Sequence, residues 1–343
     1  MSRISNEEGN GVMHTVNNNK TGSGNTKRHC KRFWWLYLLI LLIIIVAIVV
    51  PCVLLIAVPR MAQKKLNEAK LSIDGITVTN AQTDSLNMAI NSTITTDDST
   101  HATIDGFEGT MYLADVNPPL AFAKIDFPQT TSHALQTVNI SQQIPISDSN
   151  ALTTFNEHLI RQESIYVMVQ GDTHAHVRGI SCAYPVTFRK TVPLKGLNSF
   201  KGLSVTNPHV NTGQFDNFNA TAHIPNPSDL TLDIGNTTFH TYFNNTEIGT
   251  AYILNVVLRA GMTNDFFIWA DINETTILEA LTQRPWCERN GTLTFQLAGK
   301  NVTNNGQALP YFATALGATN ASVDIPIGQA VWSDIGLSIA CSD

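Results

Sequence analysis

The stretch Phe33–Val58, FWWLYLLILLIIIVAIVVPCVLLIAV, contains no charged residue and decides how the rest of the chain is organised. About 20 apolar residues in a helix span the ~30 Å core of a bilayer, so this stretch predicts a transmembrane helix. A cleaved signal peptide has a shorter apolar segment, about 7–15 residues, followed by small residues. Because the stretch runs into Pro59 and Arg60 instead, we interpret it as an uncleaved signal anchor in the lipid bilayer. Pro51 is expected to kink this helix.

The orientation of the helix is indicated by sequons, because basic residues flank the stretch on both sides. One Asn-x-Ser/Thr sequon, at Asn19, precedes the stretch. The other nine follow it, at Asn91, Asn139, Asn219, Asn236, Asn244, Asn273, Asn290, Asn301 and Asn320. This density predicts a glycosylated surface that has passed through the secretory pathway. We therefore expect a disordered cytosolic tail at residues 1–32, a transmembrane helix at 33–58 and a lumenal or extracellular remainder.

The charge of the chain limits the kind of partner. The net charge is −6, although residues 1–32 are basic, so the remainder is strongly acidic. Binding to nucleic acid requires a basic surface, and the sequence therefore predicts no nucleic-acid partner. The basic residues of the tail are expected to lie near anionic lipid headgroups.

The five cysteines divide by compartment. Cys52 lies inside the apolar stretch, and Cys30 beside it is a candidate for palmitoylation. Cys182, Cys287 and Cys341 face the oxidising side, where at most one bridge can form among three thiols. We choose Cys287–Cys341 because both lie in the second module defined below, although the sequence leaves the connectivity open.

A short amphipathic segment, residues 59–70, predicts a juxtamembrane helix. The pattern of apolar and polar residues changes after it. From Leu71 onward apolar and polar residues alternate between turn signals, which predicts antiparallel β structure. Two segments have a helical period instead. These are 149–162, with Ser149 or Asn150 as the N-cap, and 273–284, with Asn273 or Thr275 as the N-cap.

An internal repeat divides this β region in two. Ile73–Asn80 resembles Phe200–Asn207, and Val169–Gly171 resembles Leu297–Gly299 at nearly the same offset. We therefore expect two β-sandwich modules, residues 71–197 and 198–343, each with a short helix and a core of its own.

The side chains that could act in catalysis or bind a metal do not form a catalytic set. His174 and His176 share one strand face but lack clear third and fourth metal ligands. Asp97 and His101 lie in a segment typical of a solvated turn, and Cys182 is expected to be a poor nucleophile in an oxidising lumen. The sequence predicts no enzyme, no cofactor and no metal site.

Two segments of module two resemble a known family. Asn226–Gly235 (NPSDLTLDIG) is followed by Thr238–Gly249 (TFHTYFNNTEIG), in which Asn244 and Asn245 predict a tight hairpin. This pattern is similar to the late embryogenesis abundant group two proteins and the related water-stress and hypersensitive-response domain. In module one Asp98-Ser99-Thr100 stands where the family has Asn-Pro-Ser. The whole layout resembles fungal single-pass membrane proteins that carry this domain.

The resemblance implies an immunoglobulin-like or fibronectin-like sandwich without established enzymatic activity, in some relatives with lipid held in an apolar groove. It favours the vacuolar membrane, with the plasma membrane and the endoplasmic reticulum left open. The leading hypothesis is a membrane protein that binds a ligand in such a groove, possibly a lipid. The alternative is a scaffold that binds a protein or polysaccharide partner and no small ligand. A groove predicts a continuous apolar cavity, whereas a scaffold predicts a closed core and a sugar-free surface patch.

Overall fold

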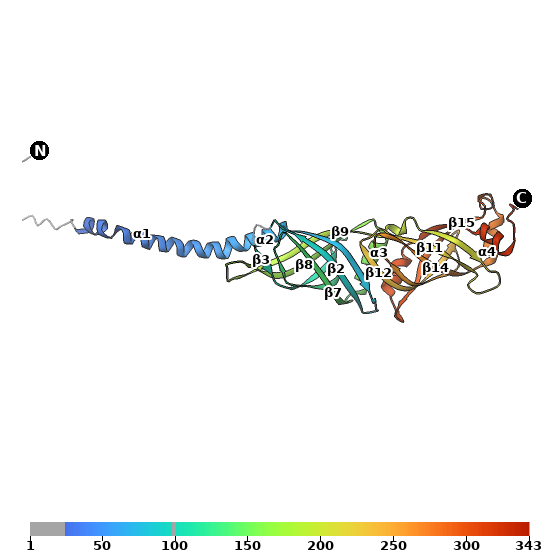
Figure 1. The fold of residues 1–343 in the computed structure, drawn as a ribbon, viewed down its shortest axis with the longest axis horizontal. Helices are drawn as coiled ribbons and strands as arrows, with labels where there is room; N and C mark the ends of the chain where they lie inside the picture. Colours follow the sequence, from blue (N-terminus) through green and yellow to red (C-terminus); the bar gives the residue numbers. More distant parts are fainter. Residues whose placement is uncertain (1–24, 98–100, 343) are drawn as a thin grey trace, which may run out of the picture. The chain divides into compact units, whose positions relative to one another are not determined.

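The computed structural model describes residues 25–97 and 101–342, with side chains from Trp34 onward (Figure 1). Four sequence predictions lie wholly or partly outside this description: the tail at residues 1–24, the sequon at Asn19, the side chain of Cys30 and the segment at residues 98–100. The chain divides into two compact units, Met1–Val58 and Pro59–Asp343.

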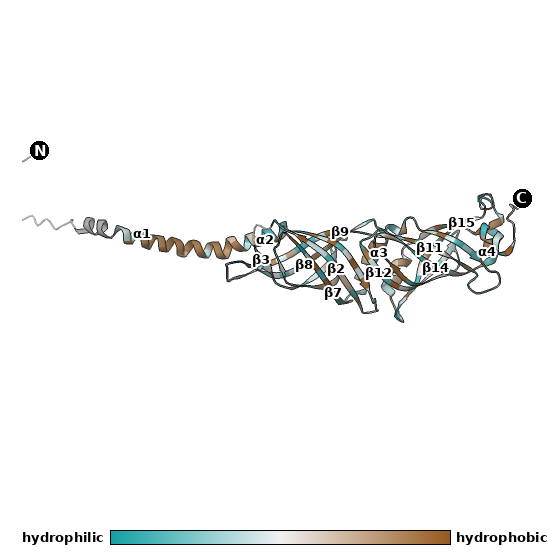
Figure 2. Cartoon of the chain, viewed as in Figure 1, coloured by the Kyte–Doolittle hydropathy of each residue, from teal (hydrophilic) through white to brown (hydrophobic). Residues whose placement is uncertain are grey.

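The described part of the first unit, residues 25–58, is helical. Helix α1 spans Asn25–Cys52, so it includes residues 25–32, which the sequence analysis placed in the disordered tail. A π-helical turn, Val53–Ala57, follows it. Figure 2 shows unbroken apolar colour along most of α1. Pro51 lies just before the π turn, where the missing proline N–H breaks the regular hydrogen-bond pattern. The described residues contain one helical stretch, Trp34–Glu68, long and apolar enough to cross a membrane, which is compatible with a single-pass protein or a signal anchor.

Helix α2 (Val58–Glu68) packs on the edge strand β9 (Ala183–Lys195). The side chain of Gln63 exchanges two hydrogen bonds, each 2.9 Å, with the backbone N–H and carbonyl of Thr187. Lys190 donates to two carbonyls at the C-terminal end of α2, where the helix dipole favours a cation. The helix therefore covers the edge of β9, which would otherwise expose unpaired backbone groups.

The second unit is mainly β, as the sequence predicts, and its described strands form two sheets. The eleven-stranded sheet contains β1 (Lys70–Thr79), β2 (Ser85–Thr95), β7 (Leu135–Pro145), β10 (Ser204–Val210), β11 (Phe218–Asn226), β12 (Leu230–Phe243), β13 (Thr246–Leu258), β14 (Met262–Ile272), β15 (Thr292–Asn304), β16 (Gln307–Ala308) and β17 (Ala321–Pro326). The six-stranded sheet contains β3 (Ala102–Ile104), β4 (Phe107–Leu113), β5 (Leu120–Phe127), β6 (Thr130–Thr131), β8 (Ser164–Val177) and β9.

The elements follow the same order in the two halves of the repeat. In the first half β7 is followed by helix α3 (Ser149–Arg161) and β8. In the second half β14 is followed by helix α4 (Glu274–Thr282) and β15. The strand–helix–strand order at the repeat offset accounts for the sequence similarity between the halves.

The expectation that each module has a core of its own is wrong at the junction. Strand β1 pairs in parallel with the start of β12, Ile76–Val78 beside Leu230–Leu232, so one sheet runs through both modules. The hydroxyl of Tyr311 donates to the carbonyl of Gln82 across the junction at 2.8 Å. The buried apolar residues form one contiguous cluster. The parallel pairing gives no local signal in the sequence, which is why alternation alone missed it.

The helices of the second unit differ from the expectation in number and caps. Asp148, and neither Ser149 nor Asn150, caps α3 through bonds to the N–H groups of residues 150 and 151. Asn273 caps α4 as one of the two predicted choices, with its side chain accepting from the N–H of Thr276. Each module contains the short helix predicted for it, and module two also contains α5 (Pro310–Gly317) and α6 (Ile327–Ile335), which the sequence analysis did not predict. Neither helix has a side-chain N-cap like that of α4, and a short apolar segment alone does not distinguish a helix from a buried strand.

Candidate functional site

In the Asn-Pro-Ser segment of the family resemblance, Asn226 and Ser228 are buried and have a structural role, whereas Pro227 is exposed. Asn226 is 1% exposed, and its amide donates to the carbonyls of Leu230 and Leu258 at 2.8 and 3.0 Å. Its side-chain oxygen accepts from the N–H and the hydroxyl of Ser228 at 3.0 and 2.6 Å. One asparagine thus joins the end of β11, the start of β12 and the end of β13. Pro227 lacks an N–H and sits in the turn that this asparagine stabilises.

The hairpin after this segment matches its prediction. Asn244 and Asn245 both have positive φ, 49° and 62°, between the paired residues Phe243 and Thr246. Two such residues form the tight turn that the twist of a two-stranded hairpin favours, which confirms the predicted turn.

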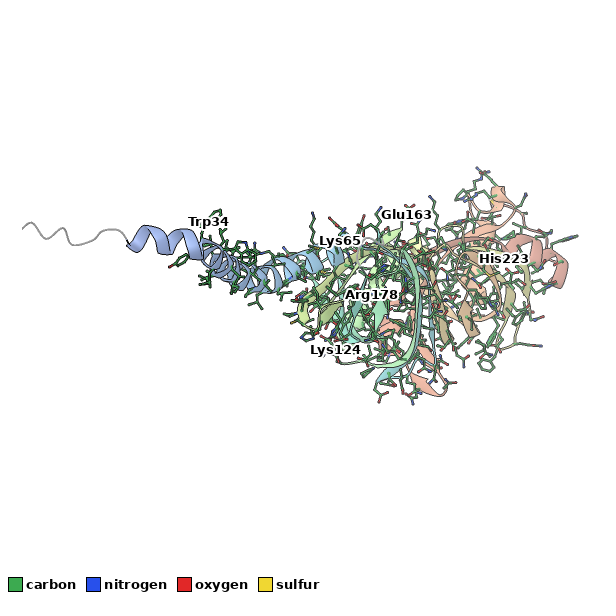
Figure 3. All side chains as sticks on the ribbon, turned by 60° about the vertical axis from the view of Figure 1, so that its left-hand side comes forward. Trp34, Lys65, Lys124, Glu163, Arg178 and His223 are labelled. Carbon is green, nitrogen blue, oxygen red and sulfur yellow. A yellow bond between two sulfur atoms is a disulfide. The ribbon has the colours of Figure 1, made fainter. Side chains whose placement is uncertain are left out.

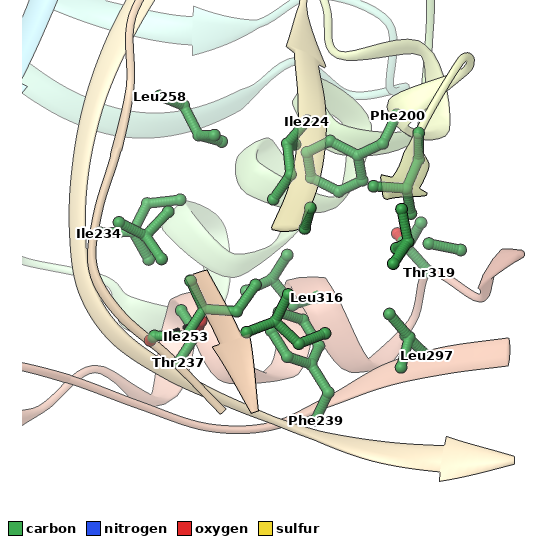
Figure 4. Close-up of a pocket in the computed structure, with 16 residues that line it drawn as sticks. Phe200, Ile224, Ile234, Thr237, Phe239, Ile253, Leu258, Leu297, Leu316 and Thr319 are labelled. Atoms are coloured by element: carbon green, nitrogen blue, oxygen red, sulfur yellow. Dashed lines mark hydrogen bonds between the residues drawn. The ribbon is translucent and has the colours of Figure 1, made fainter. Parts of the chain in front are cut away.

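The interior was the first candidate for a ligand site. The close-up in Figure 4 shows a cavity of about 60 Å³ in module two that is apolar apart from Thr237 and Thr319. Three other cavities measure about 50, 30 and 20 Å³, and the first of them is lined partly by Asn217 and Glu274. A dry cavity of about 150 Å³ holds a single benzene molecule, so none of these four cavities accommodates an acyl chain. They are packing defects of an otherwise filled core.

The nine later sequons all lie on the surface. The side chain of Asn219 is half-buried and the other eight are exposed. Five lie on strands of the eleven-stranded sheet and point away from its buried face: Asn91, Asn139, Asn219, Asn236 and Asn301. The other four lie in turns or at a helix cap of module two: Asn244, Asn273, Asn290 and Asn320.

The six-stranded sheet has no sequon on any of its strands. Its outward side chains include Tyr112, Tyr166, Gln170 and Arg189, which we call the sequon-free face. Met168 shares their side of the sheet but is only 6% exposed. Tyr112 lies opposite Met168, and Gln170 lies opposite Arg189, whose Nε donates to the Met168 sulfur at 3.2 Å. Tyr166 is 50% exposed. The alternation in the sequence marks these residues as outward-facing but does not show that they share one sheet.

Charged pairs lie around this face. His176 contacts the carboxylate of Asp105 at 2.9 Å, and this hydrogen bond lowers the pKa of Asp105. Lys124 donates to Glu108 at 2.6 Å, which raises the pKa of Lys124. Both pairs are exposed, so each is worth little as a source of stability. Apart from these charged pairs, the distinctive side chains on the sequon-free face are Tyr112, Tyr166 and Arg189.

The histidine pair considered from the sequence is exposed on β8, with His174 and His176 pointing outward. His176 is engaged by Asp105, and Asp172 accepts from the hydroxyl of Thr187 at 2.8 Å. Among the described residues no group of three histidine, cysteine or acidic side chains could hold a metal ion.

The disulfide chosen from the sequence is the one that the structure contains. Cys287 and Cys341 are bonded, with their Cα atoms 5.3 Å apart. The bond holds the segment after α6 against the end of α4, where the backbone N–H of Ser342 also donates to the carbonyl of Thr282 at 2.8 Å. Cys182 is an exposed free thiol.

Comparison with known families finds one partial match. A model described as a protein of unknown function, DUF3712, matches residues 120–241 and so extends from β5 across the module junction into β12. No curated protein matches the chain. The resemblance to late embryogenesis abundant group two proteins is not tested by this match and stays a prediction.

Three solved structures are similar over parts of the chain. A protein from Archaeoglobus fulgidus is 9% identical, covers 37% of this chain and 94% of its own length, and has a TM-score of 0.22. A cross-linked adhesin from Mobiluncus mulieris is 7% identical over 74% of this chain and 83% of its own, with a TM-score of 0.20. The CupB6 tip adhesin from Pseudomonas aeruginosa is 7% identical over 75% of this chain and 96% of its own, with a TM-score of 0.20. TM-scores of this size do not define a shared fold.

Proposed function

We propose that the chain is a single-pass membrane glycoprotein that acts as a non-enzymatic scaffold and binds a protein partner on the sequon-free face. Its N-terminal tail lies in the cytosol and its β unit lies on the lumenal or extracellular side. The observation that carries this proposal is the unequal distribution of sequons, five on strands of one sheet and none on strands of the other. A bulky sugar excludes a protein partner from the surface that it covers.

The chemistry of the sequon-free face favours a protein over a sugar or a lipid. Tyrosine and arginine are enriched at protein interfaces, and the face presents Tyr112, Tyr166 and Arg189 together, with Met168 buried against Arg189. The sheet beneath them is buried on its other side, for example through Val167 and Val169. A preorganised face loses little conformational entropy when a partner binds.

The membrane location rests on two supports. The apolar helix and the density of sequons support passage through the secretory pathway, and the family resemblance favours the vacuolar membrane among the alternatives. A chain with this orientation would carry its nine later sequons on the side where N-glycosylation occurs.

A lipid ligand would require the interior cavities to open, since the largest of the four measures about 60 Å³. Native mass spectrometry of the full-length chain, with lipid extraction, distinguishes the two functions. The scaffold predicts a mass of protein and sugar alone, whereas a lipid carrier predicts one stoichiometric lipid.

Photo-crosslinking in intact cells tests the proposed face. A photoreactive phenylalanine analogue replaces Tyr166 on the sequon-free face or Ala89, which lies on β2 beside Asn91. We expect one discrete protein adduct from position 166 that Tyr112→Ala strongly reduces, and no such adduct from position 89. An adduct of equal yield from both positions, or one indifferent to Tyr112→Ala, would contradict the proposal.

A further inference from the structure

An exposed apolar cluster lies on the outer face of the eleven-stranded sheet, in module two. It consists of Tyr252 and Leu254 on β13 with Phe267 and Trp269 on β14. Phe267 is 60% exposed and Leu254 is 48% exposed. The rings of Tyr252 and Trp269 stack, with centroids 5.9 Å apart and planes 17° apart. An exposed cluster of this kind normally has something that covers it.

The attachment point for a cover lies in the same cross-strand row. Asn219 on β11 is the residue directly opposite Trp269 on β14, and Tyr252 is directly opposite Trp269 on the other side. Directly opposite residues of antiparallel strands point to the same face, with Cβ atoms about 4.5–5.5 Å apart. The inward neighbours Ala220 and Ile268 are buried, which places the row on the outer face.

The chemistry of a sugar suits this row. An N-linked sugar leaves the amide nitrogen of its asparagine, and one face of a pyranose ring is lined by C–H groups. Those C–H groups can lie against the electron-rich face of an aromatic ring while the sugar hydroxyls stay in water. We propose that the first sugars of a glycan on Asn219 lie over the stacked rings of Trp269 and Tyr252. This inference rests on the lumenal orientation in the proposed function.

The same row supplies a matched control. Thr238 on β12 lies opposite Tyr252, and Asn301 on β15 lies opposite Thr238. Asn301 is therefore a sequon on the same face, but its neighbour in the row is a threonine instead of an indole. A glycan at Asn219 reaches the ring pair first, and a glycan at Asn301 is separated from it by a whole strand.

The other polar groups on this face lie beside the rings without covering them. His223 on β11 contacts Asp265 on β14 at 2.6 Å and Thr206 at 2.7 Å, and Figure 3 labels His223 within module two. Lys300 donates to the hydroxyl of Thr250 at 3.1 Å. These side chains form hydrogen bonds with one another.

Hydroxyl-radical footprinting of the full-length glycosylated chain tests the inference, with oxidation at each residue read by mass spectrometry. We compare the unaltered chain, Asn219→Gln and Asn301→Gln. A fourth sample is the unaltered chain treated after folding with an amidase that removes N-glycans, so that the result does not depend on how a variant folds.

We expect oxidation of Trp269 and Tyr252 to rise several-fold in Asn219→Gln and in the amidase-treated chain, and to stay unchanged in Asn301→Gln. Oxidation of Trp332, which is exposed on α6, serves as the internal reference. Equal oxidation of Trp269 with and without sugar would overturn the inference. An unoccupied Asn219 among occupied sequons would overturn it alone, whereas a chain with no occupied sequon would overturn the proposed orientation as well.

Discussion

The outer faces of the two sheets have the same backbone architecture but differ in whether they carry sequons. In both sheets, alternate residues of each strand point outward and the residues between them form a buried apolar face. Both outer faces include an exposed aromatic residue, Tyr166 on the six-stranded sheet and Phe267 on the eleven-stranded sheet. The eleven-stranded sheet carries five sequons on its strands, and the six-stranded sheet carries none. From this difference we propose two separate explanations for the exposed aromatic residues, a covering sugar on the eleven-stranded sheet and a protein partner on the six-stranded sheet.

The largest expected effect comes from placing a sugar on the sequon-free face. Arg189→Asn creates the sequon Asn-Lys-Thr at residues 189–191, on edge strand β9 and opposite Gln170 of that face. We expect the adduct formed at position 166 to fall about tenfold or more, because a sugar at this position blocks access of the partner to the face. The measurement is the adduct yield per molecule of glycosylated chain.

The matched control is Arg189→Asn combined with Thr191→Ala, which keeps the asparagine and abolishes the sequon. We expect this double variant to retain more adduct than the glycosylated single variant. Equal loss in the two would show that Arg189 itself, and not access to the face, determines binding.

A large effect on stability is expected at Asn226, which joins three strands of the sequon-bearing sheet. Asn226→Ala leaves the carbonyls of Leu230 and Leu258 without this donor, and we expect the unfolding free energy to fall by about 3 kcal/mol. Urea unfolding of the full-length chain in detergent, followed by tryptophan fluorescence, measures the change.

The exposed Asn211 provides the control for that variant. Asn211→Ala is expected to change the unfolding free energy by less than about 0.5 kcal/mol. Similar losses in the two variants would mean that the buried hydrogen bonds of Asn226 are not what holds the three strands.

The smallest expected effect is electrostatic and lies beside the sequon-free face. The hydrogen bond from His176 lowers the pKa of Asp105, so this side chain is ionised at neutral pH. The contribution of the pair to folding stability is lost only as the pH falls through the lowered pKa. His176→Gln should raise the titration midpoint of Asp105 toward the ordinary value of about 3.9. Carbon-13 NMR of the carboxyl groups measures this midpoint, and His158→Gln on α3 should leave it unchanged. An unchanged midpoint in His176→Gln would refute the assigned cause.

Local signals in the sequence predicted part of this molecule. The uncharged stretch Phe33–Val58 predicted the apolar helix, alternation predicted the β class, and Asn244-Asn245 predicted a hairpin in which both residues have positive φ. The Cys287–Cys341 choice agrees with the structure for a simple reason. Both cysteines belong to one module, and Cys182 belongs to the other.

Contacts between distant segments were not predictable in this way. Nothing local marks Ile76–Val78 as the parallel neighbour of Leu230–Leu232, so the shared core was missed. Helix α5 was missed because it is short and its Tyr311 and Phe312 fit a buried strand equally well. The sequon-free face was missed because Tyr112 and Tyr166 become neighbouring strand positions only through the order of the six-stranded sheet.

The most direct test of the central claim is a glycopeptide map of the full-length chain purified from membranes. Each of the nine later sequons is scored for occupancy. The account predicts sugar on the strand sequons of the eleven-stranded sheet, Asn219 and Asn301 among them, and an unmodified six-stranded sheet. A chain whose nine sequons are all unoccupied would contradict the lumenal orientation, and with it the division of the two faces between sugar and partner.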